Sequence, residues 1–356
     1  MTIKTLHQFI VGAAPNDAIT DHALLIRRWL REMGFNSDLY GYHIHEAIEN
    51  EVRPFATLRT GNEGNWLIVH HSIGSPAVDQ LLARGFQLVL IYHNITPPEF
   101  FAQVDPTWAN YMKLGLEQLQ QFPPQTRLAL ADSPYNELDL QQLPFQQSGV
   151  LPITLDESLY QAPSNQSLVD ELSGRRPLLL FVGRISPNKR QEDLIKLLYY
   201  YRRIEPEARL ILVGDRWQVG YDRWLEDMAR SLGLAGAVTL VGRVSQKDLT
   251  TYYRAADLYV SMSEHEGFGK PLIESMYLGL PVLAYRSTAV PYTLGGAGIM
   301  FKKKNYESLA ELVDILIKDT DLRLHLIKKQ EVQVKGFLEP QVKEQLRTYL
   351  EQLGLL

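Results

Sequence analysis

SEHEGFGKPLIESM, residues 263–276, is the stretch that decides the fold class of this chain. An apolar run at residues 257–261 precedes it, and residues 278–284 follow it as a helix end, a turn and another apolar run. This is the order strand, turn, helix, strand, which is the repeating unit of a parallel sheet. The stretch therefore lies at the carboxyl edge of a predicted sheet, where open α/β sheets bind their ligands.

The turn inside this stretch has the chemistry of an anion site. Gly267 and Gly269 permit backbone angles closed to other residues and let a ligand approach the main chain. Pro271 suits the first turn of a helix, where no N–H is needed. The N–H groups of Phe268, Gly269 and Lys270 are predicted to point outward at the positive end of the helix dipole, which favours a phosphate.

Two glutamates, Glu266 and Glu274, stand eight positions apart around this turn. Glu266 is predicted in the loop before the helix, and Glu274 about one turn inside it. Bare carboxylates would repel a phosphate, so the pair makes sense as acceptors for hydroxyl groups. A phosphate carried on a polyol, as in a nucleotide sugar, offers a phosphate for the turn and hydroxyl groups for the two glutamates. The alternative is an ordinary Gly-Pro turn with two solvated glutamates.

A basic motif lies upstream, after a wholly apolar run at residues 177–182 that is typical of a strand buried on both faces. The run ends at Gly183, and Arg184 and Lys189 follow before a helical pattern begins. An Arg fork and a Lys ammonium could together neutralise a diphosphate leaving group. Taken alone, such a pair after a strand is more often simply solvated.

Together the two motifs resemble the Gly-Arg-x-x-x-x-Lys element and the E-x7-E segment of the retaining family 4 glycosyltransferases. The resemblance covers nearly the whole chain and is most specific in residues 178–301. It implies the GT-B architecture, in which two doubly wound Rossmann-like domains face a cleft that holds the active site. It also implies that the final helix crosses back onto the first domain.

The resemblance implies a role for each motif residue. Arg184 and Lys189 would hold the two phosphates, Glu274 the ribose hydroxyls and Glu266 a hydroxyl of the transferred sugar. The loop at residues 241–245, with Val244, would read the base through its backbone. The catalytic residues expected are Arg184, Lys189, Glu266 and His93. The donor-binding residues expected are Gly12, Gly183, Val244, Gly267, Phe268, Gly269, Lys270 and Glu274.

Two of these residues lie in the first half of the chain. His93 ends an apolar run in the segment YHNITPP, which looks like a segment of many family members, and would touch the sugar or a phosphate. A structural histidine is the alternative. Gly12 follows the first predicted strand, in a loop that would let backbone amides approach the donor or acceptor. Asp17, next along, is expected to cap the following helix or to touch the acceptor.

Composition narrows the function classes. The chain has 356 residues, 45% apolar and 22% charged, and no cysteine, so disulfides and thiol catalysis are excluded. Residues 1–160 carry 9 Lys/Arg and 17 Asp/Glu, a net −8, whereas residues 161–356 carry 27 and 24, a net +3. The anionic ligand is therefore expected in the second half, and nucleic acid is not expected as a partner. No apolar run approaches a membrane span, and the first residues do not read as a secretory signal.

Alternating strand-like and helix-like segments divide the chain into two α/β halves. The first domain is predicted over residues 1–160 and the second over 161–338, with a helix over 339–356 packing back on the first. Strands are predicted at residues 4–11, 66–70, 87–92, 127–131, 150–155, 178–182, 209–213, 237–241, 257–261, 281–284 and 298–301. Helices between them include residues 18–33 and 100–122.

These observations lead to a specific functional hypothesis. The chain is expected to be a retaining glycosyltransferase that moves a hexose from a nucleotide-diphosphate sugar, GDP-mannose first and a UDP-sugar next, to a saccharide or lipid-linked acceptor in surface polysaccharide synthesis. No Asp-x-Asp stands where a metal would be needed, so no cofactor is expected. A cytoplasmic location at the inner membrane face, with peripheral contact, fits this role. The alternatives are a sugar phosphorylase, a nucleotide-sugar epimerase and a noncatalytic nucleotide-sugar-binding subunit.

Overall fold

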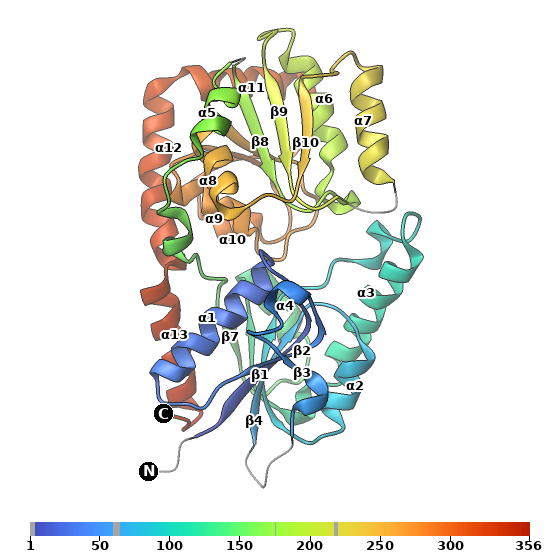
Figure 1. The fold of residues 1–356 in the computed structure, drawn as a ribbon, viewed down its shortest axis with the longest axis vertical. Helices are drawn as coiled ribbons and strands as arrows, with labels where there is room; N and C mark the ends of the chain where they lie inside the picture. The colour runs from blue at the N-terminus through green and yellow to red at the C-terminus, as the bar shows by residue number, and fades with distance from the viewer. Residues whose placement is uncertain (1–3, 60–64, 175, 217–219) are drawn as a thin grey trace. The chain divides into compact units, whose positions relative to one another are not determined.

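The computed structural model of this protein describes residues 4–59, 65–174, 176–216 and 220–356. The chain forms two compact units, which are described separately (Figure 1). Unit 1 comprises Met1–Thr154 and Glu339–Leu356, and unit 2 comprises Leu155–Leu338. Within the described residues, every helix is too short or too polar to span a lipid bilayer.

The boundary between the units lies earlier than residues 160 and 161, where composition placed it. Residues after 154 belong to unit 2 because their side chains and carbonyls bind its helices. The Tyr160 hydroxyl donates to Glu274, and the Arg254 guanidinium donates to the carbonyls of Tyr160 and Ala162. The polar stretch that suggested a linker is thus anchored on unit 2.

Unit 1 is built on a parallel sheet in the order β3-β2-β1-β4-β5-β6-β7. The chain winds outward in both directions from β1 and β4, which makes the sheet doubly wound. The bounds of its strands are β1 (Leu6–Ala13), β2 (Leu39–Ile44), β3 (Arg53–Pro54), β4 (Trp66–His71), β5 (Gln87–Tyr92), β6 (Thr126–Ala131) and β7 (Ser148–Val150).

The helices of unit 1 begin at recognisable sequence signals. Ser75, Asp105 and Ser133 each accept a hydrogen bond from a backbone N–H in the next turn, and each is followed by a proline at the first helical position. Asp17 caps the first helix in the same way, through the N–H of Thr20. The bounds are α1 (Ala18–Glu32), α2 (Pro76–Leu82), α3 (Pro106–Leu119), α4 (Pro134–Gln141) and α13 (Glu339–Gln352).

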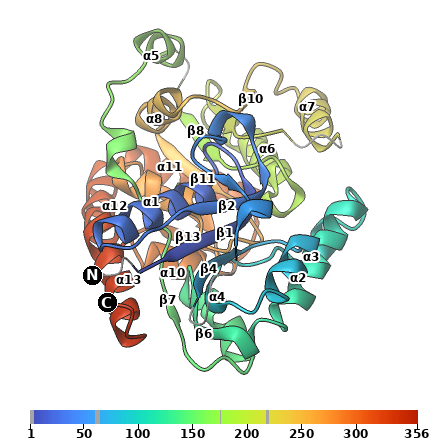
Figure 2. The same ribbon diagram turned by 60° about the horizontal axis from the view of Figure 1, so that its bottom comes forward.

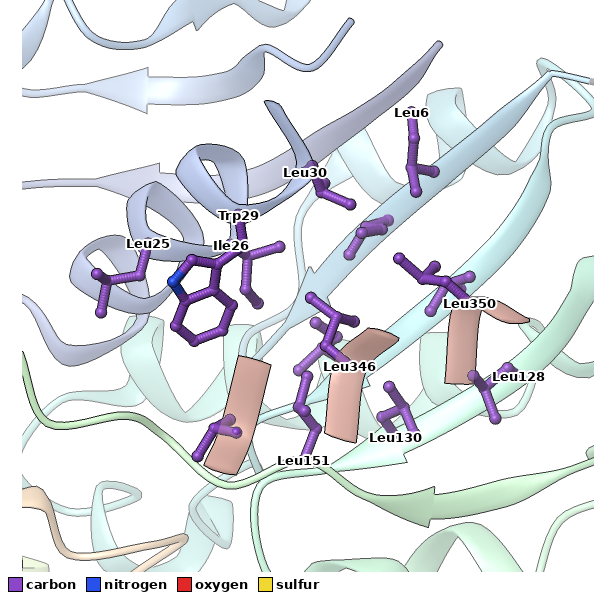
Figure 3. Packing of buried hydrophobic residues seen from close by; sticks show 14 of the residues in the cluster. Leu6, Leu25, Ile26, Trp29, Leu30, Leu128, Leu130, Leu151, Leu346 and Leu350 are labelled. Atoms are coloured by element: carbon purple, nitrogen blue, oxygen red, sulfur yellow. The ribbon is translucent and has the colours of Figure 1, made fainter. Parts of the chain in front are cut away.

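The C-terminal helix α13 completes the core of unit 1. It lies beside α1 against the sheet, with α2 and α3 on the other side of the strands (Figures 1 and 2). Leu346 and Leu350 are fully buried against α1 and β6 side chains, as Figure 3 shows. The Trp29 indole also donates to Glu339 at 2.8 Å. Burial of this apolar stripe fixes the helix on unit 1.

Unit 2 is built on a second parallel sheet, in the order β10-β9-β8-β11-β12-β13. β8 and β11 pair in parallel through Leu179 and Leu258, and successive strands are added on one side of β8 up to β10 and on the other side from β11 onward. The bounds are β8 (Leu178–Val182), β9 (Arg209–Val213), β10 (Val238–Gly242), β11 (Leu258–Ser261), β12 (Val282–Tyr285) and β13 (Ile299–Phe301). This strand order places a switch point, and hence a binding crevice, at the carboxyl ends of β8 and β11.

The helices of unit 2 pack in groups around this sheet. α6 contacts α7 and α11, whereas α9 contacts α10 and α12 and α8 contacts α5. Figure 1 shows α6 and α8 on opposite sides of β8. The bounds are α5 (Gln166–Leu172), α6 (Gln191–Tyr201), α7 (Tyr221–Ser231), α8 (Gln246–Ala255), α9 (Lys270–Tyr277), α10 (Val290–Leu294), α11 (Tyr306–Lys318) and α12 (Thr320–Gln333).

The two doubly wound α/β units confirm the predicted fold class, but three predicted elements differ from the structure by two or more residues at an end. The strand predicted at residues 150–155 ends at Val150; residues 151–155 are buried, and Leu155 forms only an isolated parallel bridge with Leu338. The helix predicted at 100–122 begins only after Asp105 caps it and ends at Leu119. The first strand begins at Leu6 and ends at Ala13, two residues later at each end than predicted.

Candidate functional site

The two motif loops meet at the switch point of unit 2. The loop after β8 carries the basic motif, and the loop after β11 carries the first glutamate. The N–H of Glu264 donates to the carbonyl of Asn188 at 2.9 Å, and the Asn188 amide donates to the carbonyl of His265 at 3.3 Å. The Ser186 hydroxyl holds the same amide from the other side at 2.8 Å. Asn188 therefore ties the loops together.

Lys189 and Glu266 form an ion pair between these loops. Lys189 Nζ lies 2.6 Å from Glu266 Oε2, and the side chains are only 18% and 15% exposed. A pair so shielded from water is held more strongly than an exposed one. The neighbouring His265 is buried, and burial, aided by the Lys189 cation, lowers its pKa to about 4. The local positive charge is therefore carried by lysine and not by histidine at neutral pH.

The backbone of Glu266 is fixed by a third loop, after β12. The N–H of Glu266 donates to Thr288 Oγ1, and that hydroxyl donates back to the Glu266 carbonyl, both at 2.8 Å. Thr288 has a φ of 37°, in the left-handed region that a β-branched residue rarely adopts. Strain of this kind persists where surrounding structure enforces it, and it often marks a functional site.

Glu274 occupies a more enclosed place than sequence suggested. It lies on the first turns of α9, is 4% exposed, and accepts hydrogen bonds from two tyrosine hydroxyls. Tyr160 Oη donates to Oε1 and Tyr253 Oη donates to Oε2, each at 2.6 Å. Burial, followed by the charge of Glu274, raises the pKa of Tyr253 well above its usual value, so it remains a donor.

The start of α9 follows the predicted strand-turn-helix pattern. Gly269 has a φ of 88°, and a Cβ there would lie 2.9 Å from Leu272 Cδ1, so the position requires glycine. The Phe268 ring is buried edge-on against Phe337, so any ligand contact by Phe268 would have to come from its backbone. Gly267 and Lys270 are half-buried beside it.

Arg184 stands exposed at the end of β8, directly after Gly183. Gly214, at the end of β9, lies so close that an added Cβ would meet the Gly183 carbonyl oxygen at 2.1 Å. Asp215 follows, and its pKa is lowered, first by hydrogen bonds from Arg243 and more weakly by Arg184. The cation of Arg184 therefore faces an ionised carboxylate across the edge of the sheet.

Val244 lies in the loop after β10, next to Arg243, and is half-buried. The Arg243 Nε donates to Asp215 Oδ1 at 2.7 Å, which joins this loop to the one after β9. The loop carrying Val244 thus belongs to the same carboxyl edge as the basic motif, two strands away from β8.

A buried carboxylate behind the site braces these loops. Asp193, on the first turn of α6, accepts from Lys304 at 2.8 Å, Lys196 at 3.0 Å and the Tyr306 hydroxyl at 2.7 Å. Its pKa is lowered, because these donors outweigh its burial. Lys304 also reaches Glu264 at 2.9 Å, which links Asp193 to the glutamate loop. These residues lack a short motif, so sequence reasoning did not find them.

His93 lies in unit 1, at the carboxyl end of β5, inside a buried polar network. Its Nε2 and His70 Nδ1 are 2.9 Å apart, and its Nδ1 lies 3.5 Å from Asp132 Oδ2. The His70 ring continues the chain to Gln8 at 2.9 Å. The His93 side chain is 1% exposed, so both nitrogens face protein groups. Contact between His93 and a ligand stays a prediction, and the observed contacts are those of a structural histidine.

Gly12, also in unit 1, is exposed near the end of β1, with open space where a Cβ would stand. Asp17, further along the chain, caps α1, which is the first of the two roles expected for it. Within the described ranges, no three His, Cys, Asp or Glu side chains are grouped so as to hold a metal ion.

The structure thus brings Gly183, Arg184, Lys189, Glu266 and the start of α9 to the switch point of unit 2, and places Val244 on the same edge. Glu274 lies within α9 but is bound by tyrosines. Besides the group around Asp193, the residues that sequence reasoning missed are Tyr160, Asn188, Tyr253 and Thr288. Only Asn188 stood inside a recognised motif, and the other three carried no signal of their own.

Comparisons with known proteins find similarity to glycosyltransferases. The profile of a family described as "Glycosyl transferases group 1" matches residues 166–333. A D-inositol 3-phosphate glycosyltransferase of Stackebrandtia nassauensis is 33% identical over 175 residues, 44% of this chain and 39% of that protein. An O-antigen chain mannosyltransferase B of Escherichia coli is 27% identical over 162 residues, 44% of this chain and 41% of that protein. The matches thus span about two fifths of these relatives.

A solved structure of HepE from Anabaena, in complex with UDP-glucose, extends the likeness to the whole fold. It covers 98% of this chain and 99% of its own, with a TM-score of 0.78 and 19% sequence identity. At that identity the likeness concerns the fold alone. Residues 166–333, just under half of the chain, are thus similar to the glycosyl transferases group 1, and the fold of the chain is the GT-B fold.

Proposed function

We propose that this protein is a retaining glycosyltransferase that takes a hexose from a nucleotide-diphosphate sugar. The observation that carries the proposal is the Lys189–Glu266 pair at the switch point, between Arg184 and the start of α9. This places a cation and a carboxylate side by side at the sheet edge where α/β folds bind nucleotides. A diphosphate needs the cation, and a sugar ring needs the hydroxyl acceptor.

The leaving group is held by positive charge. Arg184 and Lys189 bind the phosphate oxygens, and the N-terminal end of α9 adds the positive end of its helix dipole. Preorganised charge acts where negative charge develops as the sugar leaves, and it requires no metal ion. We therefore propose a metal-independent reaction in which these groups supply the charge stabilisation.

The reaction follows from this arrangement. The bond between the anomeric carbon and the diphosphate oxygen breaks, and the acceptor oxygen forms a new bond to that carbon on the same face. The proton of the acceptor hydroxyl passes to the departing phosphate oxygen, so the products are a glycoside and a nucleoside diphosphate. Glu266 orients the sugar through one of its hydroxyls once its pair with Lys189 loosens.

Relatives suggest which sugar and acceptor to test first. One relative is an O-antigen chain mannosyltransferase and another is a D-inositol 3-phosphate glycosyltransferase. GDP-mannose is therefore the first donor proposed, with UDP-glucose next because the HepE structure contains it. The acceptor class is a saccharide or a lipid-linked saccharide, as in surface polysaccharide synthesis, with the protein acting at the inner membrane face.

The decisive experiment measures product formation. The purified protein is incubated with GDP-mannose or UDP-glucose and a panel of saccharide acceptors, in EDTA and in Mg²⁺. The expected result is a glycoside whose anomeric proton in NMR has the same configuration as the donor, formed equally in both buffers. An inverted anomer would reject the retaining mechanism, and activity only with Mg²⁺ would reject metal independence.

The same assay separates the other activities. An epimerase would change the donor without an acceptor, and a phosphorylase would need inorganic phosphate in place of a nucleotide. A noncatalytic subunit would bind the donor but leave both substrates intact. Each of these results would overturn the proposed transfer reaction.

A further inference from the structure

Two loops at the β13 end of the unit 2 sheet carry cations without carboxylate partners. Arg286 follows β12, Lys302 and Lys303 follow β13, and all three side chains are exposed. Within the described residues, none of the three forms an ion pair. The name basic corner is used here for Arg286, Lys302 and Lys303. The cations of the same edge that do have a carboxylate partner are Lys189, Arg190, Arg216, Arg243 and Lys304.

The strand register places Arg286 beside Lys302. Tyr285 pairs with Phe301 in the parallel ladder, and the Arg286 N–H donates to the Phe301 carbonyl at 2.9 Å. The next residues on the two strands, Arg286 and Lys302, are therefore neighbours, with their backbones about 4.8 Å apart. Like charges side by side on neighbouring strands repel each other, and an anion bound between them would remove that repulsion. Guanidinium and ammonium groups are the usual ligands of phosphate and carboxylate oxygens.

The basic corner is connected to the loop that carries Glu266. Thr288, two residues after Arg286, exchanges two hydrogen bonds of 2.8 Å with the Glu266 backbone. Two residues span at most about 7 Å of chain, so the Arg286 backbone lies close to the Glu266 loop. From the loop after β13, Lys304 reaches Glu264 at 2.9 Å. Both loops of the basic corner are therefore bonded to the loop whose carboxylate is proposed to orient the transferred sugar.

The position of the basic corner separates it from the donor diphosphate. In the proposed function the diphosphate is bound by the loop after β8, and the sheet order places β12 and β13 two and three strands away from β8. At about 4.8 Å per strand, these separations are about 10 Å and 14 Å. An anion at the basic corner would lie on the other side of the Glu266 loop, next to the transferred sugar. The acceptor is the substrate that must approach that sugar, and separate cations would offset the repulsion between an anionic acceptor and the diphosphate.

We propose that the basic corner binds a phosphate or carboxylate group carried by the saccharide acceptor, so that the protein prefers a negatively charged acceptor to its neutral counterpart. This inference rests on the proposed function, because it assigns an acceptor subsite to that transferase. Arg286 and Lys302 bind the anionic oxygens, and Lys303 adds positive charge beside them. In this assignment none of the three touches the donor or the reacting atoms, so changes at the basic corner alter acceptor selectivity and leave donor binding intact.

Matched acceptors test the basic corner during turnover. Donor consumption from GDP-mannose or UDP-glucose is measured with a neutral monosaccharide, its 6-phosphate and its 6-carboxylate. The wild-type protein is expected to use one charged form with a kcat/KM at least about tenfold above that of the neutral form, the effect of one charge-assisted hydrogen bond. Arg286→Gln combined with Lys302→Gln should shrink that ratio to within about threefold, through KM for the charged acceptor. Lys328→Gln combined with Lys329→Gln, which removes two exposed cations from α12, is the matched control and should keep the ratio.

A binding measurement decides the case in which none of these acceptors is used. Inorganic phosphate and the sugar 6-phosphate are titrated into the protein saturated with GDP or UDP, and the backbone amides of Arg286 and Lys302 are followed by NMR. Both probes should give a saturable shift that the double Gln variant loses, and the sugar phosphate should bind more tightly. No saturable shift, or a shift that the variant keeps, overturns the inference. Inorganic phosphate that binds as tightly as the sugar phosphate assigns the basic corner to a free anion and also overturns it.

The two sets of measurements separate this inference from the proposed function. Equal use of charged and neutral acceptors by the wild-type protein overturns the acceptor preference while the transferase activity stands. A ratio that survives in the double Gln variant does the same. Absence of nucleotide binding, together with absence of donor consumption with every acceptor, would reject the proposed function itself.

Discussion

Replacing Lys189 by Met is the sharpest probe of the site, because it removes one charge and keeps the side-chain length. Lys189 Nζ lies 2.6 Å from Glu266 Oε2, and both side chains are more than four fifths buried. A hydrogen bond to a charged group contributes about 1.5–3 kcal/mol. Loss of the lysine also leaves the Glu266 carboxylate buried without a compensating charge. Unit 2 should therefore lose about 1–3 kcal/mol of stability.

The Lys189→Met change should affect turnover more than stability, with a lower and an upper limit on the loss of kcat/KM. Removing one preorganised donor from a developing oxyanion typically costs about 3–4 kcal/mol, or roughly 10²–10³ in rate. In the free protein Lys189 already binds Glu266, so part of its interaction with the phosphate replaces that bond. We expect kcat/KM to fall at least about tenfold and at most about a thousandfold.

The assay compares Lys189→Met with Lys196→Met in donor consumption at saturating and limiting donor. Lys196 is the matched control, because it also binds a carboxylate, Asp193, at 3.0 Å on α6. A double-mutant cycle with Glu266→Gln should give a coupling of about 1–3 kcal/mol. The reasoning is refuted if Lys189→Met keeps kcat/KM within about twofold of the wild type, or loses no more than Lys196→Met.

Three further predictions concern the fold and its response to pH. Leu346→Ala should destabilise unit 1 by about 2–5 kcal/mol in denaturant unfolding followed by amide exchange, and less than about 1 kcal/mol would contradict its place in the core. Burial lowers the pKa of His71 to about 4, so the unfolded chain binds a proton that the native state excludes. His71 alone should contribute a loss of about 3 kcal/mol of stability as the pH drops from about 6.5 to about 4, and His71→Gln, which still reaches toward the Gly115 carbonyl, should remove that share of the slope and leave the share of His265. Gly214→Ala should cost about 1–3 kcal/mol and weaken nucleotide binding in calorimetry, since its Cβ collides with the Gly183 carbonyl; unchanged binding would contradict the tight contact.

Much of the sheet architecture could be predicted because parallel strands buried on both faces are continuous apolar runs. Residues 178–182 and 209–213 coincide with β8 and β9 for this reason. β2 and β3 were missed, since β2 reads LYGYHI, with a glycine and a histidine, and β3 is a two-residue edge strand. β3 is too short to give a pattern, and polar residues interrupt the apolar run of β2, so composition gives both strands little signal.

The candidate site was likewise predictable only where its residues carry a local sequence signal. The loops carrying Lys189 and Glu266 were predictable, because glycine, proline and charge at a strand end have local causes. The partners of Glu274 were not, because Tyr160 and Tyr253 come from distant segments that only tertiary packing brings together. His93 shows the converse, since its place at a strand end was predicted but its enclosure by His70 and Asp132 was not.

The return of α13 to unit 1 has a consequence for synthesis. Residues 155–338 are translated before the helix that covers the apolar face beside α1. Unit 2 is therefore fully translated while unit 1 still lacks α13. Domains generally fold as soon as their residues emerge. Unit 1 therefore cannot complete its core, and its apolar face stays accessible to chaperones, until Leu346 and Leu350 leave the exit tunnel.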